Sequence, residues 1–245
     1  MRVLRREIGG MPLWAIALVI VAGCIIAGFL GVASTARGKV PQYSPPGDAS
    51  APTIPSPMPL AVFIGDSYTQ GVGGGGVQWP ALVGQAQGWD VENLGLGGTG
   101  YIRTSDVNGC GRAYCANYGE AIDEIVGSPS YILVSGGRND LGLPIADVSA
   151  AADALFGTLR ARYPNAEIFA IAPWFDDDPP PTDPADFTAA IQTAALQHGA
   201  VFLDTGQPLL GRSDLIAEDG LHPDAAGYQA LADAVDAALD PALAP

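Results

Sequence analysis

Short apolar runs alternate with longer amphipathic segments along the chain from about residue 60 onward. The short runs contain almost no polar position, which is typical of parallel strands buried on both faces of a sheet. They predict strands at residues 60–65, 89–94, 131–135, 167–172 and 200–203. The longer segments predict helices at residues 79–87, 118–126, 146–163, 187–197 and 224–239. This alternation indicates an α/β fold, a three-layer α/β/α sandwich around a central five-stranded parallel sheet.

The longest apolar run comes before this domain, at residues 13–33. Its 21 residues carry no charge, and as a helix they would extend about 31 Å, enough to cross a bilayer core of about 30 Å. Three arginines precede the run, so the positive-inside rule keeps the N-terminus in the cytoplasm and exports the residues beyond the run. We expect a single transmembrane helix, with the rest of the chain outside the cytoplasm at the cell membrane.

Two other interpretations of this segment stay open. Cleavage after the small residues 34–36 would make the run a signal peptide and release a secreted protein. Residues 21–24, with the sequence VAGC, resemble a bacterial lipobox with Cys24 as the lipidated residue, although apolar and small residues continue beyond it. All three interpretations place the C-terminal domain outside the cytoplasm.

A proline-rich segment separates the apolar run from the domain. Residues 37–59 hold seven prolines, a composition that builds no core and favours an extended, semi-rigid spacer. The predicted organisation is therefore a cytoplasmic stub with an anchor or signal peptide (residues 1–36), a linker (residues 37–58) and a globular domain (residues 59–245).

The charge of the chain is strongly uneven. The formal net charge is −15, but five of the eleven basic residues lie within the first 39 positions. Residues 40–245 carry 6 arginines, no lysine and 25 acidic residues, and 6 − 25 = −19. Nucleic-acid binding depends on Lys and Arg that displace counterions from phosphates, so nucleic acid is excluded as an expected partner.

Two of the three cysteines, Cys110 and Cys115, lie in the glycine-rich sequence NGCGRAYC. In an exported protein the default expectation for such a pair is a disulfide that closes a short loop. A metal site needs more ligands than two cysteines, and no histidine is near. We expect the disulfide, and neither a metal ion nor a cofactor.

The residues that could carry chemistry follow the predicted strands. Ser67 stands in GDSYTQG at the end of the first strand, a position that also suits an ordinary helix N-cap. Of the two histidines, His198 precedes a glycine at a helix end, where capping residues are common. His222 lies in the polar loop DGLHP, three residues after Asp219, whose carboxylate can reach the imidazole Nδ1–H. His222 is therefore the better candidate for a general base.

Two more blocks complete the pattern. The glycine-rich sequence NLGLGGTG follows the second strand, at residues 93–100, and GGRND follows the third, at residues 136–140. The order GDS, glycine-rich turn, GxND and DxxH resembles the SGNH (GDSL-like) hydrolase family, over residues 59–239. The chain has GDSY where the family name has GDSL.

The resemblance implies a flavodoxin-like SGNH hydrolase fold and a serine esterase that works without a cofactor. It makes Ser67 the nucleophile, His222 the general base and Asp219 the residue that orients His222. It also implies an oxyanion hole formed by the Ser67 N–H, the Gly98 N–H and the Asn139 side chain. Gly98 is preferred over Gly95 and Gly97 because it lies five residues after Asn93, the usual spacing in the family.

Other polar or aromatic positions receive a structural interpretation. Asp66 and Asp140 are expected to brace loops rather than touch substrate. The acidic run 176–178 precedes three prolines and lacks a ladder of calcium ligands, so we expect a solvated loop. Trp174 and Phe175 follow the fourth strand, where they either line an acyl or sugar pocket or simply pack.

Two alternatives to an esterase stay open at this point. The same residues could serve an O-acyltransferase of the cell envelope, although a single span offers no route for an acyl donor. A catalytically silent surface module that binds a ligand would keep the fold alone. The expected substrate is an ester in a lipid, a small molecule or an O-acetylated glycan, and the sequence leaves the choice among them and the oligomeric state undecided.

Overall fold

The computed structural model describes residues 7–8, 11–12, 57–179 and 184–243. The chain divides into two units, residues 1–55 and 56–245. In the first, the short strands β1 (Glu7–Ile8) and β2 (Met11–Pro12) pair antiparallel. The apolar run expected to be a membrane anchor lies outside the described residues. Within the described residues, no helix is both long and apolar enough to span a bilayer.

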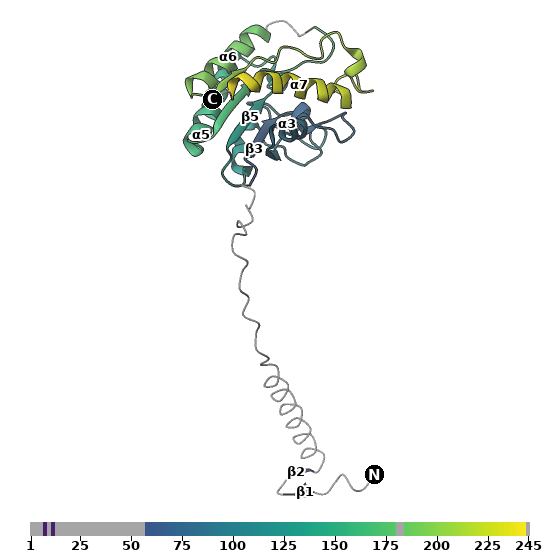
Figure 1. Ribbon diagram of the computed structural model, residues 1–245, viewed down its shortest axis with the longest axis vertical. Coiled ribbons are helices and arrows are strands. Elements are labelled where there is room, and N and C mark those ends of the chain that lie inside the picture. Colours follow the sequence, from purple (N-terminus) through teal and green to yellow (C-terminus); the bar gives the residue numbers. More distant parts are fainter. Residues whose placement is uncertain (1–6, 9–10, 13–56, 180–183, 244–245) are drawn as a thin grey trace, which may run out of the picture. The chain divides into compact units, whose positions relative to one another are not determined.

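The second unit is built around a five-stranded parallel sheet with the order β4–β3–β5–β6–β7 (Figure 1). Its strands are β3 (Leu60–Gly65), β4 (Asp90–Asn93), β5 (Tyr131–Ser135), β6 (Glu167–Ile171) and β7 (Val201–Leu203). Each lies within one of the five predicted runs, and the predicted α/β fold is confirmed. The chain moves from β3 to one edge and then returns to the other side of β3, so the carboxyl end of β3 is a topological switch point, where sites of such folds lie.

Helices cover both faces of the sheet. The α-helices are α2 (Ser67–Gln70), α3 (Trp79–Gln87), α4 (Tyr118–Ala121), α5 (Ile145–Arg162), α6 (Pro184–Gln197) and α7 (Ala225–Ala242). The 3-10 helices are η2 (Ile122–Glu124), η3 (Arg138–Asp140) and η4 (Ser213–Leu215). Helices α3 and α7 pack together on one face, and α4, α5 and α6 cover the other.

The helix predicted at residues 118–126 is too long. A capping box between Asn117 and Glu120 starts α4, but the helix tightens into η2 and ends at Glu124. Ile125 is already extended, and Gly127 has a φ of +93°. The chain must turn here to enter β5, and a glycine takes that left-handed conformation without strain.

Alternate residues of the central strands feed two separate cores. In β3, Ala61 and Phe63 belong to the core under α3 and α7, whereas Val62 and Ile64 belong to the core under α5 and α6. All four side chains are fully buried. Because successive side chains of a strand point to opposite faces, burial on both faces requires the unbroken apolar run seen in the sequence.

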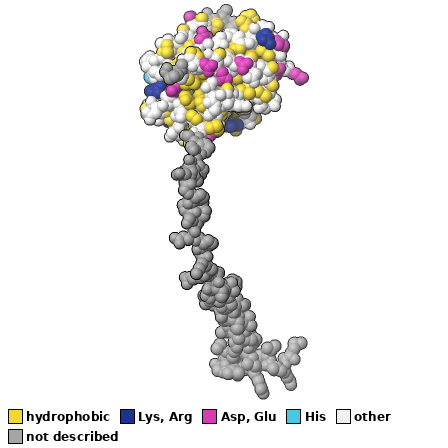
Figure 2. All heavy atoms as spheres, viewed as in Figure 1, with side chains coloured by type: hydrophobic (Ala, Val, Ile, Leu, Met, Phe, Trp, Pro, Cys, Tyr) yellow, Lys and Arg dark blue, Asp and Glu magenta, His cyan; other side chains and the backbone are white. Residues whose placement is uncertain are grey.

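Acidic side chains are spread over the face of the domain drawn in Figure 2, where basic ones are few. This agrees with the six arginines and the absence of lysine after residue 39. On that face the described residues present no broad basic patch of the kind that binds phosphate backbones.

Two buried carboxylates brace the loops at the carboxyl edge of the sheet. Asp66 is the N-cap of α2 and accepts the Tyr68 N–H at 2.9 Å. Asp140 accepts the backbone N–H groups of Tyr101 at 2.6 Å and Arg103 at 3.0 Å, which ties the segment after β4 to η3. Both acids are buried, and the expectation that they brace loops is confirmed.

Burial raises the pKa of Asp66 from 3.8 to about 6, against the opposing effects of the Tyr68 N–H and the Arg138 charge. The folded protein therefore binds a proton at Asp66 between about pH 4 and pH 6 that the unfolded chain has already released. Under proton linkage, this group lowers the free energy of unfolding as pH rises through that window.

Replacing Asp66 by Asn tests this effect. The Asn side-chain oxygen still accepts the Tyr68 N–H, but the residue is never charged. We expect the variant to gain stability over the wild type as pH rises from 4 to 7, by a total on the order of 3 kcal/mol. Chemical denaturation at each pH measures the difference. Two stability curves that run parallel between pH 4 and pH 7 would contradict the raised pKa.

Candidate active site

Ser67 is the first residue of α2, directly beyond the end of β3. The tight approach of this turn to β5 requires glycine at position 65, where a Cβ would lie 2.7 Å from the Ser135 carbonyl oxygen. As the first residue of a helix, Ser67 has an N–H without an intrahelical acceptor, and this N–H makes no hydrogen bond to any other described residue. Its hydroxyl and its N–H are therefore presented together at the carboxyl edge of the sheet.

Asp219 and His222 are joined within one short loop before α7. The Asp219 Oδ2 lies 2.7 Å from the His222 Nδ1, and the Oδ1 accepts the backbone N–H groups of Leu221 and His222, both at 3.0 Å. These bonds lower the pKa of Asp219 to about 2, and the bond from the His222 N–H has the largest effect. A carboxylate at Nδ1 favours the tautomer with its proton on Nδ1, which leaves the Nε2 of His222 as an acceptor.

The histidine loop contacts the segment that carries Ser67. The Tyr68 hydroxyl donates to the Leu221 carbonyl at 2.7 Å, and the Tyr68 and His222 rings are 5.9 Å apart. Gly73 is also close, since a Cβ there would lie 2.9 Å from the His222 Cβ. No hydrogen bond joins Ser67 to His222 directly, and the contacts of Tyr68 and Gly73 are what bring their two segments together.

The three glycines weighed for an oxyanion role differ in their N–H groups. The Gly95 N–H donates to the Asn93 side chain at 2.9 Å, and the Gly97 N–H donates to the Gln70 Oε1 at 2.7 Å. The Gly98 N–H makes no hydrogen bond to any described residue. Of these three groups, the one at Gly98 is therefore available to a ligand.

Asn139 lies on η3, beyond the end of β5. Its side-chain amide donates to the Thr99 carbonyl at 2.8 Å, which fixes the amide beside the residue that follows Gly98. An amide nitrogen carries two hydrogens, so the second remains available. The Ser67 N–H, the Gly98 N–H and this hydrogen are three donors at the carboxyl edge, on segments that follow β3, β4 and β5.

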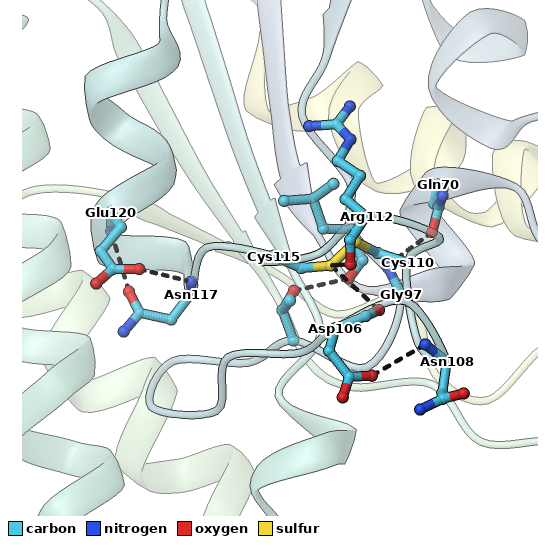
Figure 3. Close-up of a disulfide and its surroundings, with 11 residues drawn as sticks. Gln70, Gly97, Asp106, Asn108, Cys110, Arg112, Cys115, Asn117 and Glu120 are labelled. Atoms are coloured by element: carbon cyan, nitrogen blue, oxygen red, sulfur yellow. Dashed lines mark hydrogen bonds between the residues drawn. A yellow bond between two sulfur atoms is a disulfide. The ribbon is translucent and has the colours of Figure 1, made fainter.

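The predicted disulfide is present, and it braces the glycine-rich turn (Figure 3). Cys110 and Cys115 close a short loop, and the segment just before it, residues 105–109, packs against Gly97 and Gly98. A Cβ on Gly97 would lie 2.3 Å from the Gly109 carbonyl oxygen, and one on Gly98 would lie 2.5 Å from the Ser105 Oγ. The approach is so close that only glycine fits, which explains the run of glycines in this turn.

Two other sequence interpretations have clear outcomes. Trp174 and Phe175 are buried; Trp174 packs edge-on against Trp79 at 5.3 Å, so these aromatics serve packing. The acidic run is not uniformly solvated, because Asp176 forms a 2.6 Å ion pair with Arg138 and its side chain is only 15% exposed. The sequence did not predict this ion pair. It also did not predict that Gln70 accepts the Gly97 N–H; the position of Gln70 one helical turn after Ser67 was the only indication that it lies near the site.

Comparisons with known proteins agree with this arrangement. A model of the GDSL-like lipase/acylhydrolase family matches residues 63–230. The GDSL lipase Rv0518 of Mycobacterium tuberculosis is 30% identical over 193 residues, which cover 72% of this chain and 79% of the relative.

Solved structures show the same fold. A carbohydrate esterase family 2 enzyme of Corynascus thermopiles (Myceliophthora fergusii), with a carbohydrate binding domain, is 26% identical with a TM-score of 0.55; the match covers 77% of this chain and 69% of that one. The psychrotrophic esterase EstA of a Pseudoalteromonas species is 19% identical with a TM-score of 0.56, over 75% of this chain and 98% of EstA. The chain therefore belongs to the GDSL-like lipase/acylhydrolase family, and it is a carboxylic ester hydrolase.

Proposed function

We propose that the chain is an extracytoplasmic serine esterase whose triad is Ser67, His222 and Asp219. The observation that carries the proposal is the set of available groups at one sheet edge. The His222 ring is held by Asp219, which leaves its Nε2 available. The Ser67 and Gly98 N–H groups have no partner among the described residues, and the Asn139 amide keeps a second hydrogen beside its bond to Thr99. A nucleophile, an oriented base and oxyanion donors are the parts that acyl transfer requires.

The first half of the reaction acylates the enzyme. The Ser67 Oγ attacks the ester carbonyl carbon while the His222 Nε2 takes its proton. The carbonyl oxygen becomes an oxyanion, which the Ser67 N–H, the Gly98 N–H and the Asn139 amide stabilise. The tetrahedral intermediate then breaks its bond to the alcohol oxygen, and the alcohol leaves with the proton from His222.

The second half releases the acid. A water molecule gives a proton to the His222 Nε2 and attacks the acyl carbon, and the same donors stabilise the second oxyanion. The bond to the Ser67 Oγ breaks, the serine recovers its proton and a carboxylic acid leaves. Asp219 stabilises the imidazolium in both halves and stays ionised at neutral pH, since its pKa is about 2.

The proposed substrate is a carboxylic ester of the cell envelope, in a lipid, a small molecule or an O-acetylated glycan. The family's ester chemistry supports the ester, and the carbohydrate esterase among the similar structures supports a glycan. The location is supported by the arginine-flanked apolar run, the proline-rich linker and the disulfide.

Hydrolysis of p-nitrophenyl esters from acetate to long acyl chains tests the activity. In the full chain we expect turnover, and Ser67→Ala should lower kcat by about 10³-fold or more. Ser130→Ala, at the opposite edge of the sheet, should keep wild-type activity. The profile across acyl lengths separates an acetylesterase from a lipase. The proposal would be contradicted by a folded wild-type protein that does not hydrolyse these esters and is not labelled at Ser67 by a fluorophosphonate.

The two substitutions of Asp219 should separate its roles. Asn keeps an oxygen for the backbone N–H groups but turns an N–H toward the His222 Nδ1, which favours the wrong tautomer. We expect Asp219→Asn to lose kcat at nearly unchanged thermal stability, whereas Asp219→Ala should also lower the melting temperature. Both losses of kcat should be smaller than those of Ser67→Ala and His222→Ala. Equal losses in all four variants would contradict this ranking.

Protease added to intact protoplasts of a producing bacterium tests the location. The domain at residues 59–245 should be digested from outside, while a tag on the N-terminus stays protected. Recovery of the domain in the medium would instead indicate cleavage of the apolar run. Digestion that requires lysis would place the domain in the cytoplasm and contradict the proposal.

A further inference from the structure

A chain of polar contacts links the histidine loop to the segments that follow three strands, β3, β5 and β6. The Asp176 Oδ2, beyond β6, lies 2.6 Å from the Arg138 Nη2 on η3. The Arg138 Nη1 donates to the Tyr68 hydroxyl on α2 at 2.9 Å. That hydroxyl donates in turn to the Leu221 carbonyl at 2.7 Å, one residue before His222.

We propose that Tyr68 is a positioning residue for His222, and that Arg138 and Asp176 hold its hydroxyl in the required orientation. The inference rests on the proposed function, in which His222 is the base. It assigns a role to the residue after the nucleophile, where the family name has leucine. A leucine has no group that could reach the Leu221 carbonyl.

The direction of each bond in this chain is determined by chemistry. A guanidinium has only donors, so Arg138 must donate both to Asp176 and to the Tyr68 oxygen. The single proton of Tyr68 is then directed to the Leu221 carbonyl. Burial also raises the pKa of Tyr68 well above its usual value, so the hydroxyl keeps that proton at working pH.

Arg138 is held tightly enough to serve as such a support. Its side chain is 23% exposed and that of Asp176 is 15% exposed, so the pair is largely shielded from water. The guanidinium carbon lies 5.6 Å from the ring centres of both Tyr68 and Phe175. A lysine could not serve both acceptors with the same planar geometry.

The histidine loop depends on an external contact of this kind. Residues 218–221 are all exposed, and Leu221 is 40% exposed, so apolar packing does not hold the tip of the loop. The loop has internal bonds from Ala217 to His222 and from Gly220 to Ala217. Those bonds define its shape, whereas the Tyr68 hydroxyl joins the tip to the segment that carries the nucleophile.

The test is Tyr68→Phe in the full chain, which removes the hydroxyl and keeps the ring beside His222. We expect kcat to fall about tenfold, while KM stays within about twofold of the wild-type value. The substitution should displace the general base without weakening substrate binding. Hydrogen exchange followed by mass spectrometry should show faster exchange in residues 217–222. Asp176→Ala should have the same effects in weaker form, and Asp176→Asn, which keeps an acceptor for Arg138, should restore most of the activity.

A control for stability alone is Ile168→Val, in the core near the start of β6. It should lower stability by about 1 kcal/mol, similar to the loss of one hydrogen bond, without changing kcat or the exchange of residues 217–222. If Tyr68→Phe behaves like this control, or loses kcat while the loop exchanges as in the wild type, the positioning role is overturned. A wild type without turnover would refute the proposed function, and the exchange measurement, which needs no turnover, would still decide whether Tyr68 holds the loop.

Discussion

Burial of the central strands on both faces is the constraint on which the rest of the molecule depends. Side chains of β3 and β5 point into one core or the other, so a polar group within these strands would have to be desolvated on either side. Polar side chains that act on a substrate can therefore be placed only beyond the ends of the strands. Because all five strands are parallel, their carboxyl ends share one edge, and Ser67 and Asn139 reach it from adjacent strands.

Two buried carboxylates help to order the loops at that edge, together with apolar packing such as that of Trp174 and Phe175. Asp66 and Asp140 are buried among backbone N–H groups, which they satisfy in the segments after β3 and β4. An ionised carboxylate in such a place is costly, and the raised pKa of Asp66 expresses that cost. Shorter neutral side chains would be easier to bury, but they could not accept several N–H groups at once.

The sequence predicted those features that depend on local pattern. Unbroken apolar runs located the strands, and motif order located Ser67, Asp219 and His222. Contacts between distant segments could not be read in this way. Gln70 meets Gly97 only because α2 and the glycine-rich turn share an edge, and Asp176 looked solvated because its partner Arg138 lies on another strand end. Hydrophilic composition cannot tell an exposed acid from one that is paired.

The two sides of the candidate site are stabilised by different means, and the difference suits their tasks. The glycine-rich turn with Gly98 is packed against residues 105–109, which lead into the disulfide-closed loop, at distances that only glycine permits. Donors for an oxyanion act best when they need no reorganisation, and a covalently closed neighbour favours that. In the proposed mechanism His222 accepts and returns a proton in each half of the reaction, and its exposed loop contacts the segment after β3 through the Tyr68 hydroxyl. A substitution on the glycine-rich side therefore meets rigid backbone, whereas one on the histidine side acts on a loop that hydrogen bonds hold in place.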